Sequence, residues 1–191
     1  MKKLFLLFIL IAFYNTGHSQ VFPGLSSSAK KKLLASGITI PLPTWLPEGF
    51  TLDTFETNAG KGVRTPDKVL YVQYSKKLND STWQSFMVEA GFDGIGSLSY
   101  DKEAIQSPVG KIELYYQPYE EINGKKEKQE HLISTEWFQI NTIPFHVLNI
   151  VTAGSEFEVL GDEDESEGKY KYVPLSKDDF KNILQSLQIL K

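Results

Sequence analysis

The sequence predicts an α+β protein in which a curved antiparallel β-sheet is covered on one face by a C-terminal helix. Short runs rich in aromatic and β-branched residues recur through the chain and are separated by turns, a pattern typical of consecutive antiparallel strands. After Ser176 the period changes, because apolar residues recur three and four positions apart, as on one face of a helix. These residues are Phe180, Ile183, Leu184 and Leu187. We expect this helix to pack on the sheet.

Each expected strand is a run of alternating or continuous apolar residues bounded by turn residues. The runs are residues 50–56, 69–74, 83–88, 111–119, 132–140, 145–151 and 156–160. Near the N terminus, the serines at 26–28 offer N-cap oxygens for a short helix that runs through Ala35 and ends at Gly37. Three prolines between residues 38 and 47 predict an extended connector from this helix to the first strand.

The N terminus has the pattern of a secretory signal peptide. Lys2 and Lys3 precede an unbroken apolar run at residues 4–13, and the small residues Gly17 and Ser19 follow. As a helix this run would span about 15 Å, half of a bilayer core of about 30 Å, so a membrane-spanning helix is not expected. We expect cleavage after Ser19 and export to the periplasm or the medium, with no transmembrane segment in the mature chain.

The expected organisation has three parts: a signal peptide at 1–19, a lead-in with a short helix at 20–37, and a single α+β domain at 38–191. Loss of Lys2 and Lys3 with the signal peptide leaves 18 basic and 24 acidic residues, a net charge of −6. An acidic chain lacks the basic surface that binds the phosphates of nucleic acids, so nucleic acid is excluded as a partner. The absence of cysteine excludes disulfides, thiolate metal sites, a cysteine nucleophile and a lipidated N-terminal cysteine.

The sequence lacks the patterns that mark catalytic sites. His131 and His146 lie on predicted strands, without acidic or cysteine partners at the spacing of metal ligands. The chain also has no Gly-x-Ser-x-Gly elbow and no phosphate-binding loop. We therefore predict no catalytic residue, no metal and no cofactor. The alternative is a hydrolase whose acid, histidine and serine come together only in the folded chain.

A dense acidic cluster at residues 161–168 offers a second alternative, a weak calcium-binding module. Asp162, Asp164 and Ser166 alternate as oxygen ligands do in calcium loops. The sixth position is Glu167 where such a loop needs glycine, and the twelfth is Val173 where it needs glutamate. A solvated, self-repelling loop between the last strand and the final helix is the favoured interpretation.

Aromatic residues supply the candidate binding site. On each strong predicted strand, alternate side chains form a clear apolar face, yet the opposite face still carries large apolar groups. The predicted ligand-binding residues there are Tyr71, Trp83, Met87, Tyr115 and Tyr119. Aromatic residues are common on half-buried sheets, so a purely structural role is the alternative. The functional interpretation is a concave face that binds an apolar ligand, a peptide or an envelope protein.

Two segments resemble a family of bacterial exported domains of unknown function. The segment 43–52, Pro-Thr-Trp-Leu-Pro-Glu-Gly-Phe-Thr-Leu, is similar to the family's opening motif, and 174–187 is similar to its closing acidic helix followed by Ser-Leu. The resemblance implies a fold like the half-barrel of periplasmic lipoprotein carriers and sigma-factor regulators, over about residues 40–190. It carries over no catalytic residue. Because the mature chain has no membrane helix and has a long 110–140 region, the resemblance implies a non-catalytic envelope protein rather than a sigma-factor regulator.

Overall fold

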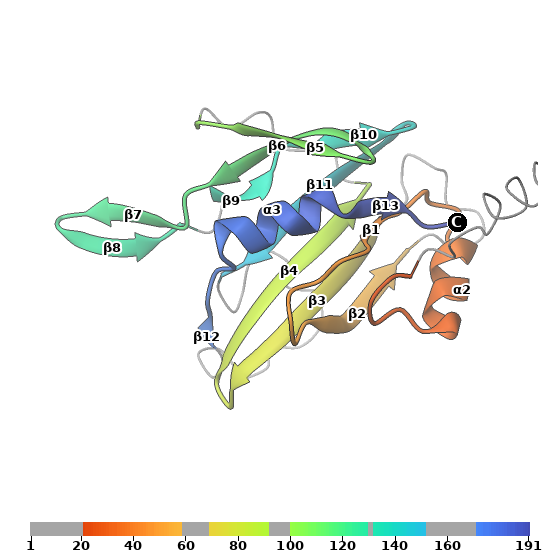
Figure 1. Cartoon of the computed structure of the whole chain (residues 1–191), viewed down its shortest axis with the longest axis horizontal. Coiled ribbons are helices and arrows are strands. Elements are labelled where there is room, and N and C mark those ends of the chain that lie inside the picture. Colours follow the sequence, from red (N-terminus) through yellow and green to blue (C-terminus); the bar gives the residue numbers. More distant parts are fainter. Residues whose placement is uncertain (1–20, 59–68, 92–99, 130–131, 152–170) are drawn as a thin grey trace, which may run out of the picture.

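The structure is a computed structural model that describes residues 21–58, 69–91, 100–129, 132–151 and 171–191. The predicted signal peptide, His131, the predicted strand at 156–160 and the acidic cluster at 161–168 lie outside these ranges. The described chain is mostly antiparallel β-sheet with two helices, and its sheets are not closed, as expected for an α+β protein (Figure 1). Neither described helix is long and apolar enough to cross a bilayer.

The described helices are α2 (Ser27–Ala35) and α3 (Lys177–Gln185). The strands are β1 (Pro41–Pro43), β2 (Thr51–Thr57), β3 (Leu70–Asn79), β4 (Thr82–Ala90), β5 (Glu103–Ser107), β6 (Gly110–Tyr116), β7 (Tyr119–Ile122), β8 (Lys125–Lys128), β9 (Ile133–Thr135), β10 (Phe138–Ile140), β11 (Ile143–Ile150), β12 (Lys171–Tyr172) and β13 (Leu187–Ile189).

Nine of the described strands form the main sheet, in the order β2-β3-β4-β11-β9-β6-β5, with β10 paired to β11 and β12 paired to β4. All its pairings are antiparallel except that of β12 with β4. Two smaller ribbons, β1-β13 and β7-β8, accompany it. The β7-β8 hairpin projects from one end of the molecule (Figure 1).

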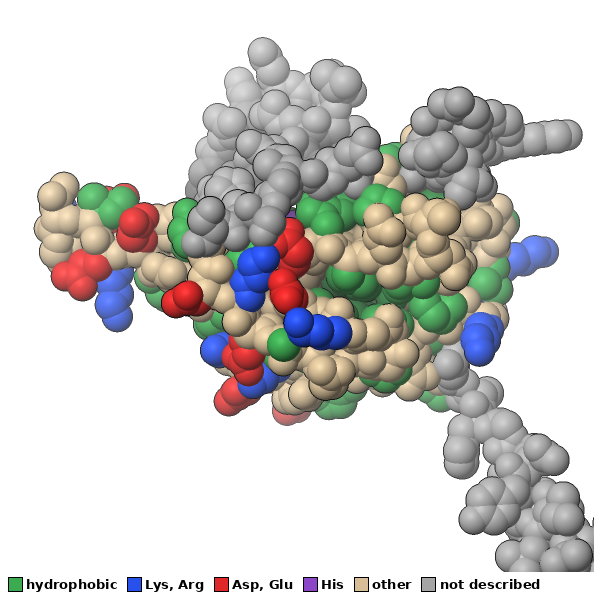
Figure 2. Space-filling model, turned by 90° about the horizontal axis from the view of Figure 1, so that it is seen from above, with side chains coloured by type: hydrophobic (Ala, Val, Ile, Leu, Met, Phe, Trp, Pro, Cys, Tyr) green, Lys and Arg blue, Asp and Glu red, His purple; other side chains and the backbone are tan. Residues whose placement is uncertain are grey.

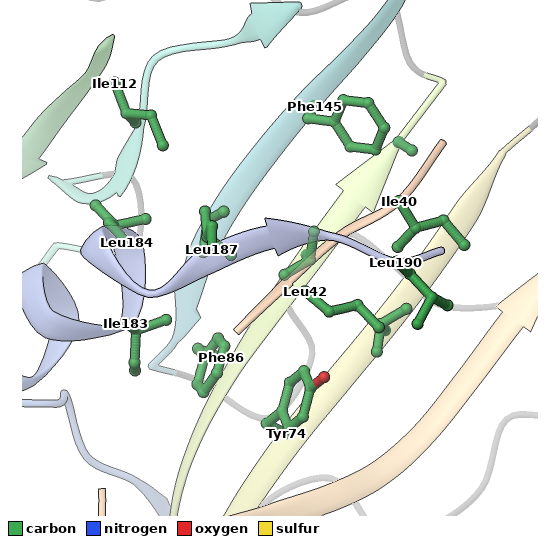
Figure 3. Close-up of a cluster of buried hydrophobic side chains, with 14 of the residues drawn as sticks. Ile40, Leu42, Tyr74, Phe86, Ile112, Phe145, Ile183, Leu184, Leu187 and Leu190 are labelled. Atoms are coloured by element: carbon green, nitrogen blue, oxygen red, sulfur yellow. The ribbon is translucent and has the colours of Figure 1, made fainter. Parts of the chain in front are cut away.

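The hydrophobic core lies between one face of the main sheet and a layer formed by α3, β1 and β13 (Figure 3). We call this the inner face. Alternation places Val72, Tyr74, Phe86, Val88 and Phe145 on it, and each of these side chains is buried. Ile183, Leu184 and Leu187 contribute the opposing apolar stripe, as the helical period predicts. Each fully buried side chain of this size contributes about 1.5–3 kcal/mol.

Both predicted helix starts are confirmed by their N-caps. Ser176 Oγ accepts a hydrogen bond from the Asp179 amide at 3.0 Å, and Ser26 Oγ accepts one from the Ala29 amide at 3.1 Å. These bonds satisfy amides that have no partner inside the helix. Gly37, at φ 70°, follows the last turn of α2 as predicted.

The segment predicted as a lead-in packs against the same core. Phe22 and Leu33 are buried members of it. Gly24 lies so close to β2 that a Cβ atom on it would stand 2.8 Å from the Leu52 amide nitrogen, at a φ of +73°. Only glycine fits this approach without displacement of the backbone.

Two predicted strands are interrupted, each for a local reason. The strand expected at 111–119 ends at Tyr116, because Pro118 has no amide to donate to a neighbouring strand. The strand expected at 132–140 divides into β9 and β10. Between them, the Glu136 amide donates a hydrogen bond to the Glu113 carbonyl of β6 at 2.7 Å. The prolines at 41 and 43 were expected in a connector, yet they lie in β1, which pairs with β13 in a two-stranded ribbon among the described residues.

Candidate functional site

The face of the main sheet opposite the core, which we call the outer face, carries four of the five predicted binding residues. Tyr71 alternates with the inner residues Leu70 and Val72 on β3, and Met87 alternates with Phe86 and Val88 on β4. Trp83 on β4 pairs with Lys77 on β3. Lys77 lies on the same face as Tyr71, because the two residues are an even number of positions apart on that strand. Tyr115 on β6 pairs with Ser134 on β9, and Ser134 pairs with Leu148 on β11. Leu148 in turn pairs with Met87, so Tyr115 also lies on the outer face.

Tyr119, the fifth predicted residue, does not share this face. We expected it to continue the alternation of Tyr115, but β6 ends at Tyr116 and Tyr119 begins the separate β7-β8 ribbon. Its side chain is 42% exposed on that hairpin. The hairpin otherwise carries mainly Lys and Glu, and these charges project into solvent (Figure 2).

A row of polar and aromatic residues crosses four neighbouring strands of the outer face. Glu56 pairs with Tyr71, Tyr71 pairs with Glu89, and Glu89 pairs with His146. We call these residues the Glu89 row. The Trp137 ring lies beside the row and stacks on His146, with the ring centroids 4.9 Å apart and 22° between the planes.

The Glu89 carboxyl group is the most unusual member of the row. The residue is only 2% exposed, and its Oε2 lies 3.3 Å from His146 Nδ1. Its Oε1 is buried with no hydrogen-bond partner among the described residues. A buried polar atom without a partner costs free energy, so the fold tolerates an unfavourable group at this position.

The carboxylates of the row also affect the pKa of the Tyr71 phenol. Burial raises the pKa of Tyr71, and the nearby carboxylates of Glu89 and Glu56 raise it further. The phenol therefore stays protonated at neutral pH. The accessible part of the Glu89 row combines the exposed Glu56 carboxylate with the half-buried Tyr71 ring, which suits a ligand that brings N–H donors and an apolar body.

A polar network occupies the adjoining part of the outer face. A register shift between Leu52 and Thr54 lets Asp53 approach β3, where its Oδ2 accepts from Ser75 Oγ at 2.9 Å and from Gln73 Nε2 at 3.3 Å. Ser75 and Ser85 share a hydrogen bond of 2.7 Å. Since Ser75 gives its only proton to Asp53, Ser85 is the donor to Ser75. This network satisfies its buried hydroxyls internally and so differs from the Glu89 carboxylate.

Tyr115 and Trp83 are partly engaged by neighbouring cations. Lys102 Nζ lies 5.3 Å from the centroid of the Tyr115 ring, and the Tyr115 hydroxyl donates to Glu136. Hydrogen bonds to Glu136 and Tyr115 raise the pKa of Lys102 above its usual range. Lys77 Nζ lies 5.9 Å from the Trp83 ring centroid. Tyr115 and Met87 are buried, with 1% and 6% exposure, so they are structural members of the face, whereas Tyr71 and Trp83 keep an intermediate exposure.

The Glu89–His146 pair bears on the enzymatic alternative. Sequence reasoning found no acidic partner for His146, because the pairing of β4 with β11 joins residues that are distant in the chain. An acid and a histidine are two members of a hydrolytic triad. Within the described ranges, however, His146 makes no hydrogen bond to a serine. The same residues contain no group of three or more His, Asp or Glu side chains that could hold a metal ion.

Comparison of the chain with protein-family models, with curated proteins and with solved structures finds no match. The two segments that carry the sequence resemblance lie side by side in the fold. Pro43 pairs with Leu187, and the Thr44 amide donates to the Ser186 carbonyl at 3.1 Å.

Proposed function

We propose that this protein is an exported, non-catalytic bacterial envelope protein whose outer face binds a segment of a partner protein. The observation that carries the proposal is the Glu89 carboxylate, whose buried Oε1 has no partner within the described chain although it lies beside Tyr71 and His146. Binding sites commonly retain groups that are unfavourable in the free protein, because the ligand satisfies them. Export is supported by the signal-peptide pattern at residues 1–19.

The arrangement of layers supports the choice of face. Leu33 of α2 and Phe180 of α3 both belong to the core on the inner face. The outer face instead presents Tyr71, Trp83 and His146 with intermediate exposure. Aromatic residues of this kind anchor many protein interfaces, since they bury a large area with little loss of side-chain freedom.

The charge of the face distinguishes among the three occupants expected from the sequence. A purely apolar ligand would leave the carboxylates of Glu56 and Glu89 without compensation. A polypeptide segment can present Lys or Arg side chains to the exposed Glu56 carboxylate and apolar side chains to Tyr71 and Trp83, and it reaches the buried Glu89 only when the groups that cover Glu89 move aside. A basic and apolar segment of a partner protein is therefore the occupant that we propose.

We further propose a relationship to the half-barrel folds of periplasmic lipoprotein carriers and sigma-factor regulators. The proposal is supported by the antiparallel sheet with its covering helix, and by the contact between the opening segment at Pro43 and the closing segment at Leu187. A relationship of this kind is consistent with a partner-binding role in the envelope.

An array of short peptides of varied sequence tests the binding function. The mature chain, residues 20–191, is expected to retain peptides in which Lys or Arg is flanked by apolar residues. Tyr71→Ala and Glu89→Gln are expected to weaken this retention about tenfold, whereas Lys30→Gln on α2, the helix that packs on the inner-face core through Leu33, is expected to leave it unchanged. Failure of the wild-type chain to select any peptide class, or equal retention by Tyr71→Ala, would overturn the proposal.

A further inference from the structure

A shallow hollow lies on the helix side of the sheet, on the opposite side from the outer face. It is a depression of about 370 Å³ that is wide open to solvent, and it is lined by Trp45, Asn182, Gln185 and Ser186. Trp45 is 40% exposed there, although tryptophan side chains are highly buried on average.

The main chain around Trp45 is held from two directions. Ser186 O accepts from the Thr44 amide at 3.1 Å and from Thr44 Oγ1 at 2.8 Å. Ser186 Oγ in turn lies 3.3 Å from both the amide nitrogen and the carbonyl oxygen of Trp45. The indole is therefore presented by fixed main chain rather than by a mobile loop, so little ordering is needed when a ligand binds.

The rest of the lining is neutral and rich in hydrogen-bonding groups. Asn182 and Gln185 are three residues apart on α3, so they are neighbours on one exposed face of the helix. Neither carboxamide makes a hydrogen bond to another side chain in the described ranges, and each offers both donors and an acceptor. The four described residues that line it are all uncharged, which suits a neutral ligand.

We propose that this hollow binds a neutral carbohydrate. One face of a pyranose ring presents C–H groups, which pack on the electron-rich face of an indole. Its hydroxyls both donate and accept, as the two carboxamides and the Ser186 hydroxyl do. The site favours a β-linked glycan, because equatorial substituents leave a flat C–H face for Trp45. This site is separate from the outer face and does not depend on the function proposed for it.

Calorimetric titration with defined oligosaccharides tests the inference. The probes are cellohexaose, chitohexaose and maltohexaose, and a proline-rich peptide represents the other class of ligand that packs on exposed tryptophan. The wild-type chain is expected to bind at least one β-linked oligosaccharide and to bind maltohexaose more weakly. Trp45→Ala is expected to reduce the affinity about tenfold or more, and Trp45→Phe to reduce it less.

Two further variants keep the result interpretable. The double variant Asn182→Ala with Gln185→Ala places good helix formers on an exposed helix face, so α3 is retained while affinity is expected to fall several-fold. Leu78→Ala removes an apolar side chain of similar exposure, 44%, on a different part of the surface and is expected to bind like the wild type. Lack of binding to every oligosaccharide, binding undiminished in Trp45→Ala, or Trp45-dependent binding of the peptide alone would overturn the inference.

Discussion

Glu89 and His146 face each other across the pairing of β4 with β11, with Glu89 Oε2 3.3 Å from His146 Nδ1 and Glu89 Oε1 buried without a partner within the described chain. The free protein therefore carries an unfavourable group where we propose that a partner binds. Stability and binding are expected to respond in opposite directions when this group is neutralised.

Glu89→Gln is the substitution that tests this opposition. The carboxamide keeps the shape and the hydrogen bond to His146, and a neutral group costs less to bury than a carboxylate. We expect the free energy of unfolding at neutral pH to rise by about 1 kcal/mol, measured by urea denaturation. Glu56→Gln, in the same row but exposed, is expected to change it by less than about 0.5 kcal/mol. A loss of stability in Glu89→Gln would show that the carboxylate is satisfied in the free protein.

Tyr74→Phe is expected to stabilise the protein. The Tyr74 ring is fully buried and stacks on Phe86 with centroids 5.0 Å apart, while its hydroxyl has no hydrogen-bond partner among the described residues. Removal of the hydroxyl eliminates a buried unpaired group and should raise the free energy of unfolding by about 1 kcal/mol. Tyr116→Phe is the matched control, because the Tyr116 hydroxyl donates to the Leu175 carbonyl, and it is expected to lose about 1 kcal/mol. Equal effects of the two substitutions would refute this explanation.

An ion-pair cluster between α3 and β5 predicts a pH dependence. Lys177 and Lys181 donate to Glu103 at 2.8 Å and 2.5 Å and lower the pKa of its carboxyl group from 4.5 to about 2. Because the folded-state pKa is depressed, the stabilisation is fully present above pH 4.5 and is lost as the pH falls through about 2.

Urea denaturation of Glu103→Gln measures this dependence. The variant is expected to unfold at a lower urea concentration than the wild type near neutral pH, and the difference is expected to shrink progressively as the pH falls from 4.5 to about 2. High salt should reduce the difference, since the cluster is exposed to solvent. A difference that is constant over this pH range would mean that the ion pairs do not contribute.

Export is tested by the N terminus of the mature chain. If the signal peptide is cleaved after Ser19, mass spectrometry of the exported protein will find Gln20 as its first residue. A chain that keeps Met1 after fractionation would contradict the proposed export. Replacement of Leu7 by Lys in the apolar run is expected to retain the precursor inside the cell.

Local rules predicted the parts of the fold that depend on neighbouring residues. The caps Ser26 and Ser176 bond within their own helices, and the alternation of β3 and β4 assigns Tyr71 and Met87 to the outer face. The sequence also contains a local signal for Glu89. Glu89 directly follows the apolar residues 86–88 of β4, where burial of a carboxylate is unfavourable. A charged residue at such a position indicates a function.

Contacts between distant segments could not be predicted in this way. The ribbon of β1 and β13 joins Pro41 to Ile189, and the Glu89–His146 pair depends on the register of β4 against β11. Register is set by the packing of the whole core, which no short window of sequence contains. The departure of Tyr119 from the outer face has a local cause in Pro118, but its place in a separate hairpin depends on the pairing of β7 with β8.

Photo-crosslinking from the exported chain tests the proposed binding face most directly. The photoreactive residue p-benzoylphenylalanine is placed at position 71 on the outer face or, as a control, at position 119 on the β7-β8 hairpin. Our account predicts that position 71 crosslinks to a polypeptide segment of a second protein, that Glu89→Gln reduces the yield about tenfold, and that position 119 gives no such product. Equal crosslinking from both positions, or a lipid as the only adduct at position 71, would contradict it.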